Sequence, residues 1–447
     1  MSRKNTNHIL LATLFCVLLG CDNKPSSDTS AVSNSAATAA GNSIAEDRTI
    51  LSELSEQKRQ AVANLSFEEF ERTVFKEEFE NGKYIVNGDT PIANKKLLRE
   101  FYEANVKRKP QAREEGETEF IINTVGGLDT LWPPHKKRAI SYCVSDQFGP
   151  RQQKVIAAMQ TAAAAWEQAA DIKFKYLANN NNRCNAANTN VTFDVRPVNV
   201  LGHYLARAFF PNETRSKRNL LIDDSSFALN PNGRLTLTGI LRHELGHVIG
   251  ARHEHTRPDS GKCFEDNNWR PLTNYDAFSV MHYPHCNGQG DWTLQLTERD
   301  KSGTACVYGA APGFDIDPSI VNDINDCASS NTPSQSGGQP RTQVFNNQVV
   351  AAGEEKRYGD FSVVPGSVFV ATMTTVAASS GDPDLYLAFD RTPVQGLEYD
   401  CRPYAIGANE ACDVVVPNGV SVARILVHGY RAGAYQLNVN YVEAGGG

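Results

Sequence analysis

Three histidines and a glutamate lie close together in the sequence, at spacings that suit a metal site. His243, Glu244, His247, Gly250 and His253 spell H-E-x-x-H-x-x-G-x-x-H. His243 and His247 are four residues apart, so on a helix they lie on one face, about one turn apart. Glu244 is rotated by about 100° from His243, near enough to reach a metal-bound water without being a ligand. Three imidazoles leave one coordination position open, which is typical of a catalytic zinc site.

The segment that carries this motif is predicted to be helical. Gly250 supplies the left-handed residue that ends many helices, after which the chain turns back to bring in His253. An isolated H-E-x-x-H also occurs by chance on surface helices with solvated side chains, but the longer motif argues against that alternative. An apolar stripe at helical spacing lies roughly opposite the first two histidines: Leu237, Leu241, Leu245 and Val248.

A second motif, S-V-M-H-Y at 279–283, follows downstream and has the character of the methionine turn of metzincins. With the run H-E-H-T-R-P-D at 253–259, it resembles the astacin branch of the metzincin zinc endopeptidases. L-W-P at 131–133 and I-S-Y at 140–142 also resemble the start of an astacin catalytic domain. The resemblance covers about residues 128–310.

The resemblance implies a role for each matching position. His243, His247 and His253 match the ligands of one catalytic Zn²⁺, and Glu244 matches the general base. Zinc lowers the pKa of its bound water to about 7, and Glu244 would pass the proton on to the leaving amine. Tyr283 matches a tyrosine that swings onto the metal and stabilises the oxyanion. The implied reaction is peptide hydrolysis without a covalent intermediate.

Other matching positions support the site. Met281 matches the methionine below the metal, and Glu254 matches a glutamate that a water bridge ties to the new N-terminus after activation. His255 and His282 are interpreted as loop supports, not metal ligands. The sequence departs from the astacin pattern at two points: the usual cysteine before the second strand is absent, and no arginine immediately precedes Leu131. The family's disulfide pattern and mature N-terminus are therefore not carried over.

The N-terminus has the features of a bacterial export signal. Basic residues precede an apolar run at 9–19 that is too short to span a membrane, and L-L-G-C follows at 18–21. This ending resembles a lipobox, with 1–20 as a lipoprotein signal peptide and Cys21 as the lipidated residue; the alternative is a plain signal peptide with a chance cysteine. Residues 21–47 are predicted to be a disordered tether. We therefore expect an exported, membrane-anchored lipoprotein, either periplasmic or at the cell surface.

Residues 48–127 are predicted to be a prosegment. The charged, amphipathic stretch 48–80 is expected to form two helices. A hairpin is expected from Lys83 to Ile92, around Asn87-Gly88-Asp89.

Asp89 has two interpretations. Residues 22–142 contain no cysteine, which excludes a cysteine switch of the matrixin kind if Cys21 is lipidated. Gly88-Asp89 resembles the aspartate switch of astacin prosegments, in which a carboxylate takes the open zinc position. Because Asn-Gly is also a common turn pair, we favour a simple hairpin turn.

Residues 128–328 are predicted to form an α/β metzincin catalytic domain. It would contain a mixed sheet and the helix that carries His243 and His247, called here the zinc helix. A helix is expected from Arg151 to about Ala170. Residues 206–210 are a candidate edge strand for binding an extended substrate by strand addition. Further strands are expected at Ile172–Leu177, Val191–Val195 and Leu220–Ile222.

A linker at 329–341, rich in Ser, Gln, Gly and Pro, marks a domain boundary. Residues 342–447 alternate polar and apolar residues between turn signals, which predicts an all-β sandwich. Motifs such as D-P-D-L-Y at 382–386 and N-E-A-C at 409–412 resemble the bacterial pre-peptidase C-terminal domain. That resemblance implies an accessory module rather than a second active site.

The cysteine count agrees with export. Removing Cys16 with the signal and assigning Cys21 to lipid leaves eight cysteines, an even number that suggests disulfides. Proximity predicts Cys401–Cys412. Cys263–Cys286 is a candidate brace between the zinc helix and the methionine turn, and the other four cysteines are not assigned partners.

These features favour an exported zinc endopeptidase that acts on proteins or peptides. The net charge of −7 argues against a nucleic-acid partner. The alternative is an inert peptidase fold that serves as a surface binding or adhesion lipoprotein through its C-terminal sandwich. The enzyme is favoured because an inert scaffold has no need of the base Glu244.

Overall fold

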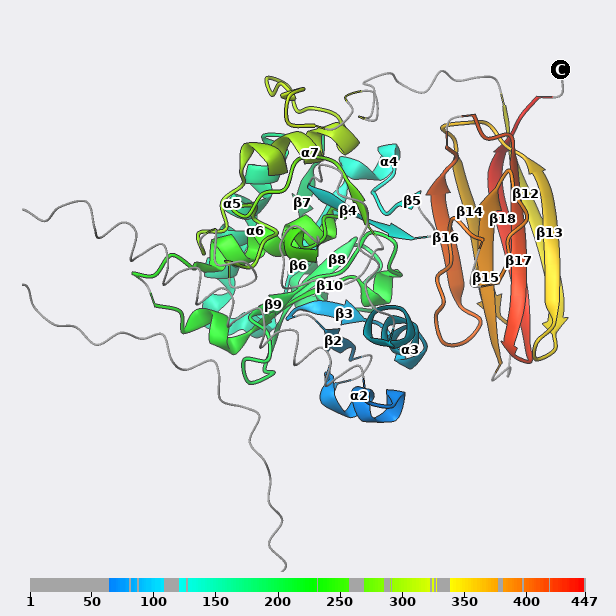
Figure 1. Cartoon of the computed structure of the whole chain (residues 1–447), viewed down its shortest axis with the longest axis horizontal. Coiled ribbons are helices and arrows are strands. Elements are labelled where there is room, and N and C mark those ends of the chain that lie inside the picture. The colour runs from blue at the N-terminus through cyan, green and yellow to red at the C-terminus, as the bar shows by residue number, and fades with distance from the viewer. Residues whose placement is uncertain are drawn as a thin grey trace, which may run out of the picture. The chain divides into compact units, whose positions relative to one another are not determined.

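The computed structural model describes residues 64–79, 82–86, 88–107, 120–125, 128–230, 232–256, 269–284, 290, 292–321, 324, 327, 338–376, 381–395, 398–417 and 419–445. All of them belong to one compact unit, Leu51–Gly447. They form an N-terminal region, a central α/β domain and a C-terminal β domain, each with its own hydrophobic core (Figure 1). The predicted signal peptide, tether and Cys21 lie outside the described residues. Within the described residues, no helix is both long and apolar enough to cross a membrane.

The N-terminal region contains a short helix and the predicted hairpin. In α2 (Phe67–Thr73), Ser66 and Glu69 form a capping box that satisfies the free N–H groups of the first turn. Strands β2 (Tyr84–Val86) and β3 (Thr90–Ile92) pair antiparallel, and β1 (Phe75–Lys76) pairs with β2. The hairpin prediction is confirmed, whereas most of the first predicted helix lies outside the described residues. The region continues through α3 (Lys95–Phe101) and a π-helix, η1 (Tyr102–Lys107).

The central domain is built on a five-stranded mixed sheet in the order β7-β6-β8-β10-β9. Strand β9 pairs antiparallel with β10, and the other pairs are parallel. The predicted edge strand is therefore confirmed, although it is shorter than expected. The strands are β6 (Ile140–Val144), β7 (Phe174–Tyr176), β8 (Phe193–Val198), β9 (Ala206–Arg207) and β10 (Asn219–Asp223).

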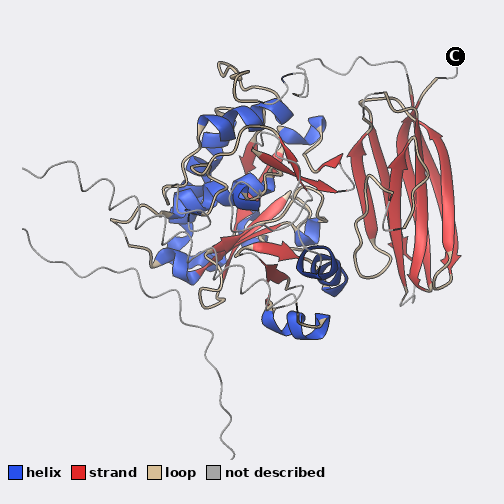
Figure 2. Cartoon of the chain, in the orientation of Figure 1, coloured by secondary structure: helices blue, strands red, loops and turns tan. Residues whose placement is uncertain are grey.

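Two helices, α5 (Gln152–Glu167) and α6 (Leu237–Val248), pack together in the helical part of this domain (Figures 1 and 2). The indole N–H of Trp166 on α5 donates a 2.9 Å hydrogen bond to the carbonyl oxygen of Arg242 on α6. This contact is fully buried, so it links the two helices within the core. The 3-10 turns of the domain are η2 (Asp146–Arg151), η3 (Ala178–Arg183), η4 (Arg215–Lys217), η5 (Asp224–Phe227) and η6 (Glu254–Thr256).

The central domain begins earlier than the predicted boundary at residue 128. Strand β4 (Ile121–Val125) lies between β5 (Leu128–Asp129) and β11 (Trp269–Pro271), and Phe120 and Ile122 belong to the central core. A Cβ at Gly303 on α7 (Glu298–Tyr308) would lie 2.5 Å from the Phe120 ring, so the ring packs directly on that helix. The short helix α4 (Pro134–Lys137) follows β5. The boundary was missed because β4 pairs with a strand about 150 residues away.

The C-terminal domain consists of two antiparallel sheets that share one core (Figure 2). Their strand orders are β12-β18-β14-β16 and β13-β17-β15. Strand β12 begins at Gln339, inside the predicted linker, because this largely exposed edge strand shows no apolar alternation. The strands are β12 (Gln339–Val350), β13 (Glu355–Ser362), β14 (Val368–Thr375), β15 (Asp382–Phe389), β16 (Glu410–Val415), β17 (Val422–Arg431) and β18 (Gly433–Glu443).

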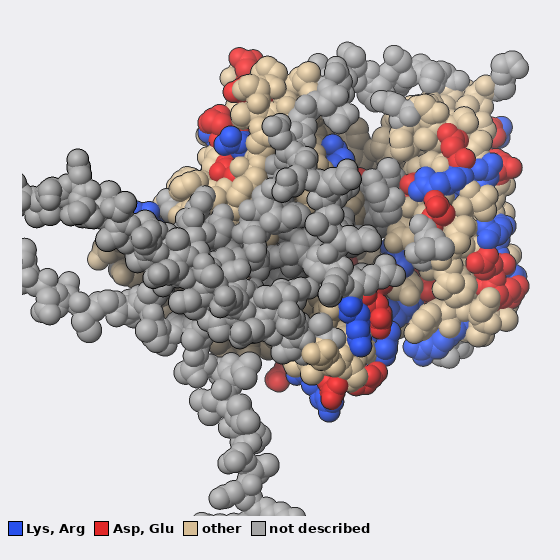
Figure 3. Space-filling view, viewed as in Figure 1, with Lys and Arg blue, Asp and Glu red and all other residues tan. Residues whose placement is uncertain are grey.

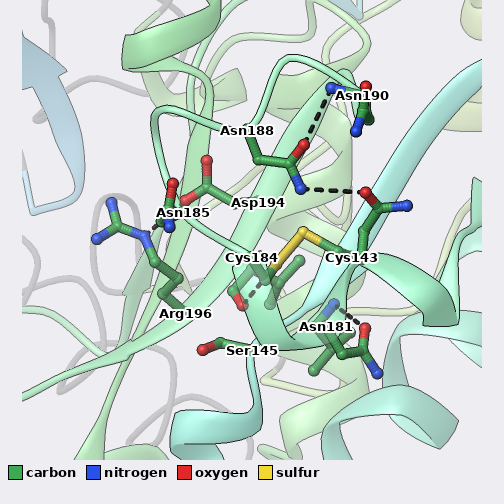
Figure 4. The surroundings of a disulfide bond; sticks show 12 residues. Cys143, Ser145, Asn181, Cys184, Asn185, Asn188, Asn190, Asp194 and Arg196 are labelled. Atoms are coloured by element: carbon green, nitrogen blue, oxygen red, sulfur yellow. Dashed lines mark hydrogen bonds and ion pairs between the residues drawn. A yellow bond between two sulfur atoms is a disulfide. The ribbon is translucent and has the colours of Figure 1, made fainter.

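Disulfides join three pairs of described cysteines. The predicted Cys401–Cys412 bond is confirmed, and Cys143–Cys184 and Cys306–Cys327 account for four cysteines that had no assigned partner. Asparagines surround the Cys143–Cys184 bond (Figure 4), and the side-chain oxygen of Asn181 accepts the N–H of Val144 over 3.1 Å. The proposed Cys263–Cys286 pair lies outside the described residues.

On the face shown in Figure 3, basic and acidic side chains of the C-terminal domain lie next to one another. Ion pairs of this domain include Arg341–Glu443 at 2.6 Å and Arg424–Asp360 at 2.5 Å. Exposed pairs of this kind each contribute about 0–1 kcal/mol, so the apolar core is the main source of the domain's stability.

Candidate metal centre

Helix α6 and the turn after it position the three motif histidines. Thr236 caps the helix, its side chain accepting the N–H of Gly239. Gly250 follows the helix with φ of +97°, and a Cβ there would lie 2.5 Å from the carbonyl oxygen of Thr130. Both the backbone conformation and the close approach therefore require glycine. The turn brings His253 back to the helix and places the carbonyl oxygen of Ala251 2.9 Å from Nδ1 of His247.

The ring nitrogens of the three histidines converge. Nε2 of His253 lies 3.2 Å from Nε2 of both His243 and His247. Together with a carboxylate oxygen of Asp89, these atoms lie within 4.8 Å of one another, and all four residues are buried. Three residues of the group were predicted as ligands from the motif, while the fourth comes from the N-terminal region.

The hydrogen bonds of the rings fit a metal ion between them. Nδ1 of His243 lies 2.7 Å from the carbonyl oxygen of Val280, and Nδ1 of His247 is bonded in the same way to Ala251. A carbonyl oxygen only accepts, so these Nδ1 atoms carry the protons and both Nε2 atoms present lone pairs to the centre. Nε2 of His253 lies 3.2 Å from each of these two atoms, so one metal ion could be bound by all three nitrogens. Tetrahedral zinc with Zn–N bonds of about 2.0–2.1 Å separates ligand nitrogens by about 3.3 Å, so the donor set fits zinc.

The surroundings of the site lower the pKa of two of the four converging residues. Burial, with the neighbouring His253 and His243, lowers the pKa of His247 well below its usual value. For Asp89, burial alone would raise the pKa, but His253 and His243 outweigh it and hold the pKa well below the usual range. His247 is thus neutral and Asp89 ionised, and both states are able to bind a metal.

Glu244 lies beside the ligands without being one of them. It is 2% exposed, and its Oε2 has no hydrogen-bond partner among the described residues. Burial and the negative charge of Asp89 raise its pKa well above the usual value. A buried carboxyl with an unbonded oxygen beside three converging histidines is a candidate for proton transfer.

Met281 lies directly beneath the zinc helix. It is fully buried, and a Cβ at Gly246, between the first two histidines, would lie 2.3 Å from its sulfur atom. Glycine at 246 thus allows the methionine to pack against the helix backbone. Glu254, also predicted as a support, accepts the N–H of Asp276 over 3.0 Å, and its own N–H donates to the carbonyl oxygen of Met281.

Tyr283 and Asp89 meet beside the histidine group. The hydroxyl of Tyr283 donates to Oδ2 of Asp89. Oδ2 lies 3.3 Å from Nε2 of His243, and Oδ1 lies 3.0 Å from Nε2 of His253. Gly88 has φ of +97°, and a Cβ there would lie 3.2 Å from the Tyr283 ring. The two interpretations of Asp89 are therefore compatible: it lies in the hairpin turn, and that turn carries its carboxylate to the histidines.

The two histidines interpreted as loop supports make such contacts. Nε2 of His282 lies 2.7 Å from the hydroxyl of Tyr275. Nδ1 of His255 accepts the N–H of Tyr283 over 3.3 Å. Neither belongs to the group of converging ligand atoms among the described residues.

Sequence reasoning missed the residue that holds the methionine turn. Asp300, fully buried at the start of α7, accepts the N–H of Val280 over 2.9 Å and the hydroxyl of Ser279 over 2.5 Å. It also accepts the N–H of Thr297 as part of a capping box. The T-x-x-D spacing of that box is visible in the sequence, but its contact with the turn is not.

A second contact missed from the sequence anchors the N-terminal region. Glu77 accepts two hydrogen bonds of 2.7 Å from Arg207 on the edge strand β9 and one of 2.6 Å from the hydroxyl of Tyr204. Both charged side chains are at most 1% exposed. Thr90 and Pro91 line one small pocket together with Ala208, Phe209, Phe210 and His247. The N-terminal region thus covers the edge strand that was expected to bind substrate.

The chain also matches a family model and is similar to known proteins. Residues 132–260 match the family model described as Matrixin, Peptidase_M10. Over 118 residues the chain is 33% identical to "Embryonic protein UVS.2" of Xenopus laevis, a match that spans 22% of this chain and 22% of that protein. The chain is also similar to a solved structure titled "Solution structure of vEP C-ter 100", at 30% identity and a TM-score of 0.18, over 21% of this chain and 87% of the other. The matrixin match and the buried histidine group together support a zinc peptidase of the metzincin type.

Proposed function

We propose that this protein is an exported, astacin-like zinc endopeptidase held latent by its own N-terminal region. The observation that carries the proposal is the convergence of three histidine nitrogens beside the buried, unbonded carboxyl oxygen of Glu244. A structural zinc site is closed by four protein ligands, whereas a catalytic site keeps one position open. The fourth group in this site is Asp89, which belongs to a hairpin outside the central domain.

Each group around the site is assigned a separate role in peptide hydrolysis. Zinc, when bound to the three histidines, supplies an activated water molecule and polarises the scissile carbonyl group. Glu244 takes the proton of the attacking water and gives it to the leaving amine. Tyr283, once released from Asp89, donates a hydrogen bond from its hydroxyl to the developing oxyanion.

Latency follows from what the N-terminal region occupies. Asp89 holds the fourth position of the histidine group and also engages the hydroxyl of Tyr283. Glu77 anchors the same region on Arg207 of the edge strand. A substrate that adds a strand to β9 would have to displace these contacts. Removal of the region would therefore free the fourth ligand position, the oxyanion donor and the edge strand together.

The remaining parts of the proposal rest on the sequence. The L-L-G-C ending at 18–21 supports lipidation of Cys21 and anchoring of an exported protein to a membrane. The motifs of residues 342–447 support an accessory domain of the pre-peptidase C-terminal type. The alternative, an inert adhesion protein, is less well supported, because such a protein has no role for a buried base beside three ligands.

Chelation provides the direct test of the proposed activity. Casein hydrolysis by the activated protein should be abolished by a zinc chelator and restored by added zinc, because the reaction requires the ion that the three histidines are proposed to bind. The assay should be run after limited proteolysis, which removes the N-terminal region. Hydrolysis that persists with the metal fully removed would exclude the proposed mechanism.

The role of Tyr283 predicts a specific kinetic change. In the activated protein, Tyr283→Phe should lower kcat by about 10²–10³-fold with little change in KM, because the hydroxyl acts only as the oxyanion forms. Zinc should stay at one per chain, since the three histidines remain. If Tyr283 only packs beside the methionine turn, phenylalanine keeps the ring and kcat should fall by less than about threefold. Rates on a quenched peptide separate these results.

A further inference from the structure

The C-terminal domain contains two buried aspartates, called here the acidic pocket, that the proposed peptidase chemistry does not use. Asp382 and Asp384 begin strand β15 and are 1% and 0% exposed. Gly407 donates its N–H to Oδ1 of Asp382 over 2.7 Å. Oδ2 of Asp384 is buried and has no hydrogen-bond partner among the described residues. Buried carboxylates require a cation nearby, because the low-polarity interior solvates an isolated charge poorly.

The cation in this structure is a lysine of the N-terminal region. Nζ of Lys96, on α3, lies 2.6 Å from Oδ1 of Asp384 and 3.4 Å from Oδ2 of Asp382. The ring centroids of Tyr404 and Tyr430 lie 4.1 and 4.2 Å from the same nitrogen. The side chain of Lys96 is 8% exposed. Two carboxylates and two tyrosine rings thus surround one ammonium group.

The pocket is held in shape by its own domain. Tyr404 has φ of +49°, a left-handed conformation that is unfavourable for a residue with a side chain. The guanidinium of Arg402 lies 4.1 Å from the centroid of the Tyr404 ring and supports it from within the same loop. Arg402 also forms a two-bond ion pair with Glu100, at 2.8 and 2.6 Å. Glu100 is one turn after Lys96, so the domain contacts a cation and an anion on the same face of α3.

The surroundings of the pocket suit an organic ammonium better than a metal ion. Ammonium groups are attracted to aromatic ring faces, whereas Ca²⁺ requires six to eight oxygen ligands. Among the described residues, only Asp89 and the three histidines bring three or more candidate metal-ligand atoms within 4.8 Å. The acidic pocket does not meet that condition.

We infer that Asp382, Asp384, Tyr404 and Tyr430 form a binding pocket for lysine side chains. In the full-length chain, Lys96 fills the pocket. When the N-terminal region is removed, which is the step that rests on the proposed function, the pocket becomes available to a lysine of a protein substrate. The accessory domain then holds the substrate by a lysine while the peptidase domain cleaves it.

Calorimetric titration of the full-length protein with Nα-acetyl-lysine methylamide tests the pocket directly. Every sample carries Glu244→Gln, which prevents self-cleavage. With Lys96→Ala the pocket is free, and we expect a dissociation constant of about 1 mM or tighter, as for a well-placed small ligand. With Lys96 present, binding should be at least tenfold weaker. Lys95→Ala is the matched control, because Lys95 pairs with Glu71 instead and is 51% exposed.

Two substitutions in the pocket locate the binding. Tyr430 is 46% exposed, so Tyr430→Leu in the Lys96→Ala protein should keep the fold and weaken binding by roughly three- to tenfold through the lost ring contact. Asp384→Asn in the same background should abolish binding. Nα-acetyl-norleucine methylamide, which lacks the ammonium group, should not bind.

The inference is overturned if the lysine compound fails to bind the Lys96→Ala protein, or binds it equally after Asp384→Asn and Tyr430→Leu. Binding of Ca²⁺ that depends on Asp384, without lysine binding, would identify a metal site instead. Because the readout is binding to a catalytically inactive chain, failure of the peptidase proposal would leave this result unchanged.

Discussion

Replacing Glu244 by glutamine is expected to remove nearly all peptide hydrolysis while zinc stays bound at one per chain. The substitution keeps the size and shape of the side chain and leaves the three histidines in place, but it removes the group that takes the proton from water. General-base catalysis of this kind contributes about 10²–10⁴-fold to the rate. Turnover of a quenched peptide and zinc content should be measured on the same preparation of activated protein.

His247→Ala provides the contrasting control. Its ring nitrogen lies 3.2 Å from that of His253 within the ligand group, so removing the ring leaves two imidazoles, which hold zinc poorly. Activity and zinc should therefore both fall, whereas Glu244→Gln loses activity alone. A Glu244→Gln protein that cleaves peptides at close to the wild-type rate would refute the assigned base.

Asp89→Ala in the full-length precursor should raise its basal peptidase activity by about ten- to a hundredfold. The substitution removes a carboxylate that lies 3.0 Å from Nε2 of His253 and 3.3 Å from that of His243. As the group in the fourth ligand position, this carboxylate should favour the latent state by about 1.5–3 kcal/mol, the range of a contact to a charged group. The loss also frees the hydroxyl of Tyr283. Initial rates before any cleavage of the precursor, checked by gel, measure the effect.

Glu77→Ala separates anchoring from ligand replacement. It leaves Arg207 buried without its carboxylate, and breaking a buried pair in this way costs about 3–5 kcal/mol. The N-terminal region should therefore detach more readily, and basal activity should rise even though Asp89 is intact. If Glu77→Ala activates the precursor while Asp89→Ala leaves it latent, Asp89 is only a turn residue and the aspartate-switch proposal fails.

The parts of the site that sequence reasoning predicted are local. His243 and His247 lie on one helix face because they are four residues apart, and Gly250 ends the helix because glycine adopts its positive φ without strain. The hairpin around Gly88-Asp89 and the Cys401–Cys412 bond likewise depend on neighbours within about a dozen residues. Spacing and turn chemistry determine such features before the chain is folded.

Contacts between distant segments could not be predicted from local spacing and turn chemistry. Strand β4 lies in the stretch predicted as prosegment, and its pairing with β11, about 150 residues away, leaves no local sign in the sequence. The support of the methionine turn by Asp300 and the anchoring of Glu77 on Arg207 were missed for the same reason. Each of these contacts joins two distant elements. The periodicity of an element indicates which of its residues are buried, but not which other element they contact.

By itself, the sequence predicted the histidine group with Glu244 beside it, the edge strand and the all-β character of the C-terminal domain. All of these depend on short-range spacing and alternation. Only the tertiary structure decided that the turn residue Asp89 reaches the histidines, where it meets Tyr283 from 194 residues away. Only the tertiary structure placed Lys96 between two aspartates nearly 290 residues further along the chain. Packing and charge compensation select such partners, and both act only when the folded chain brings distant segments together.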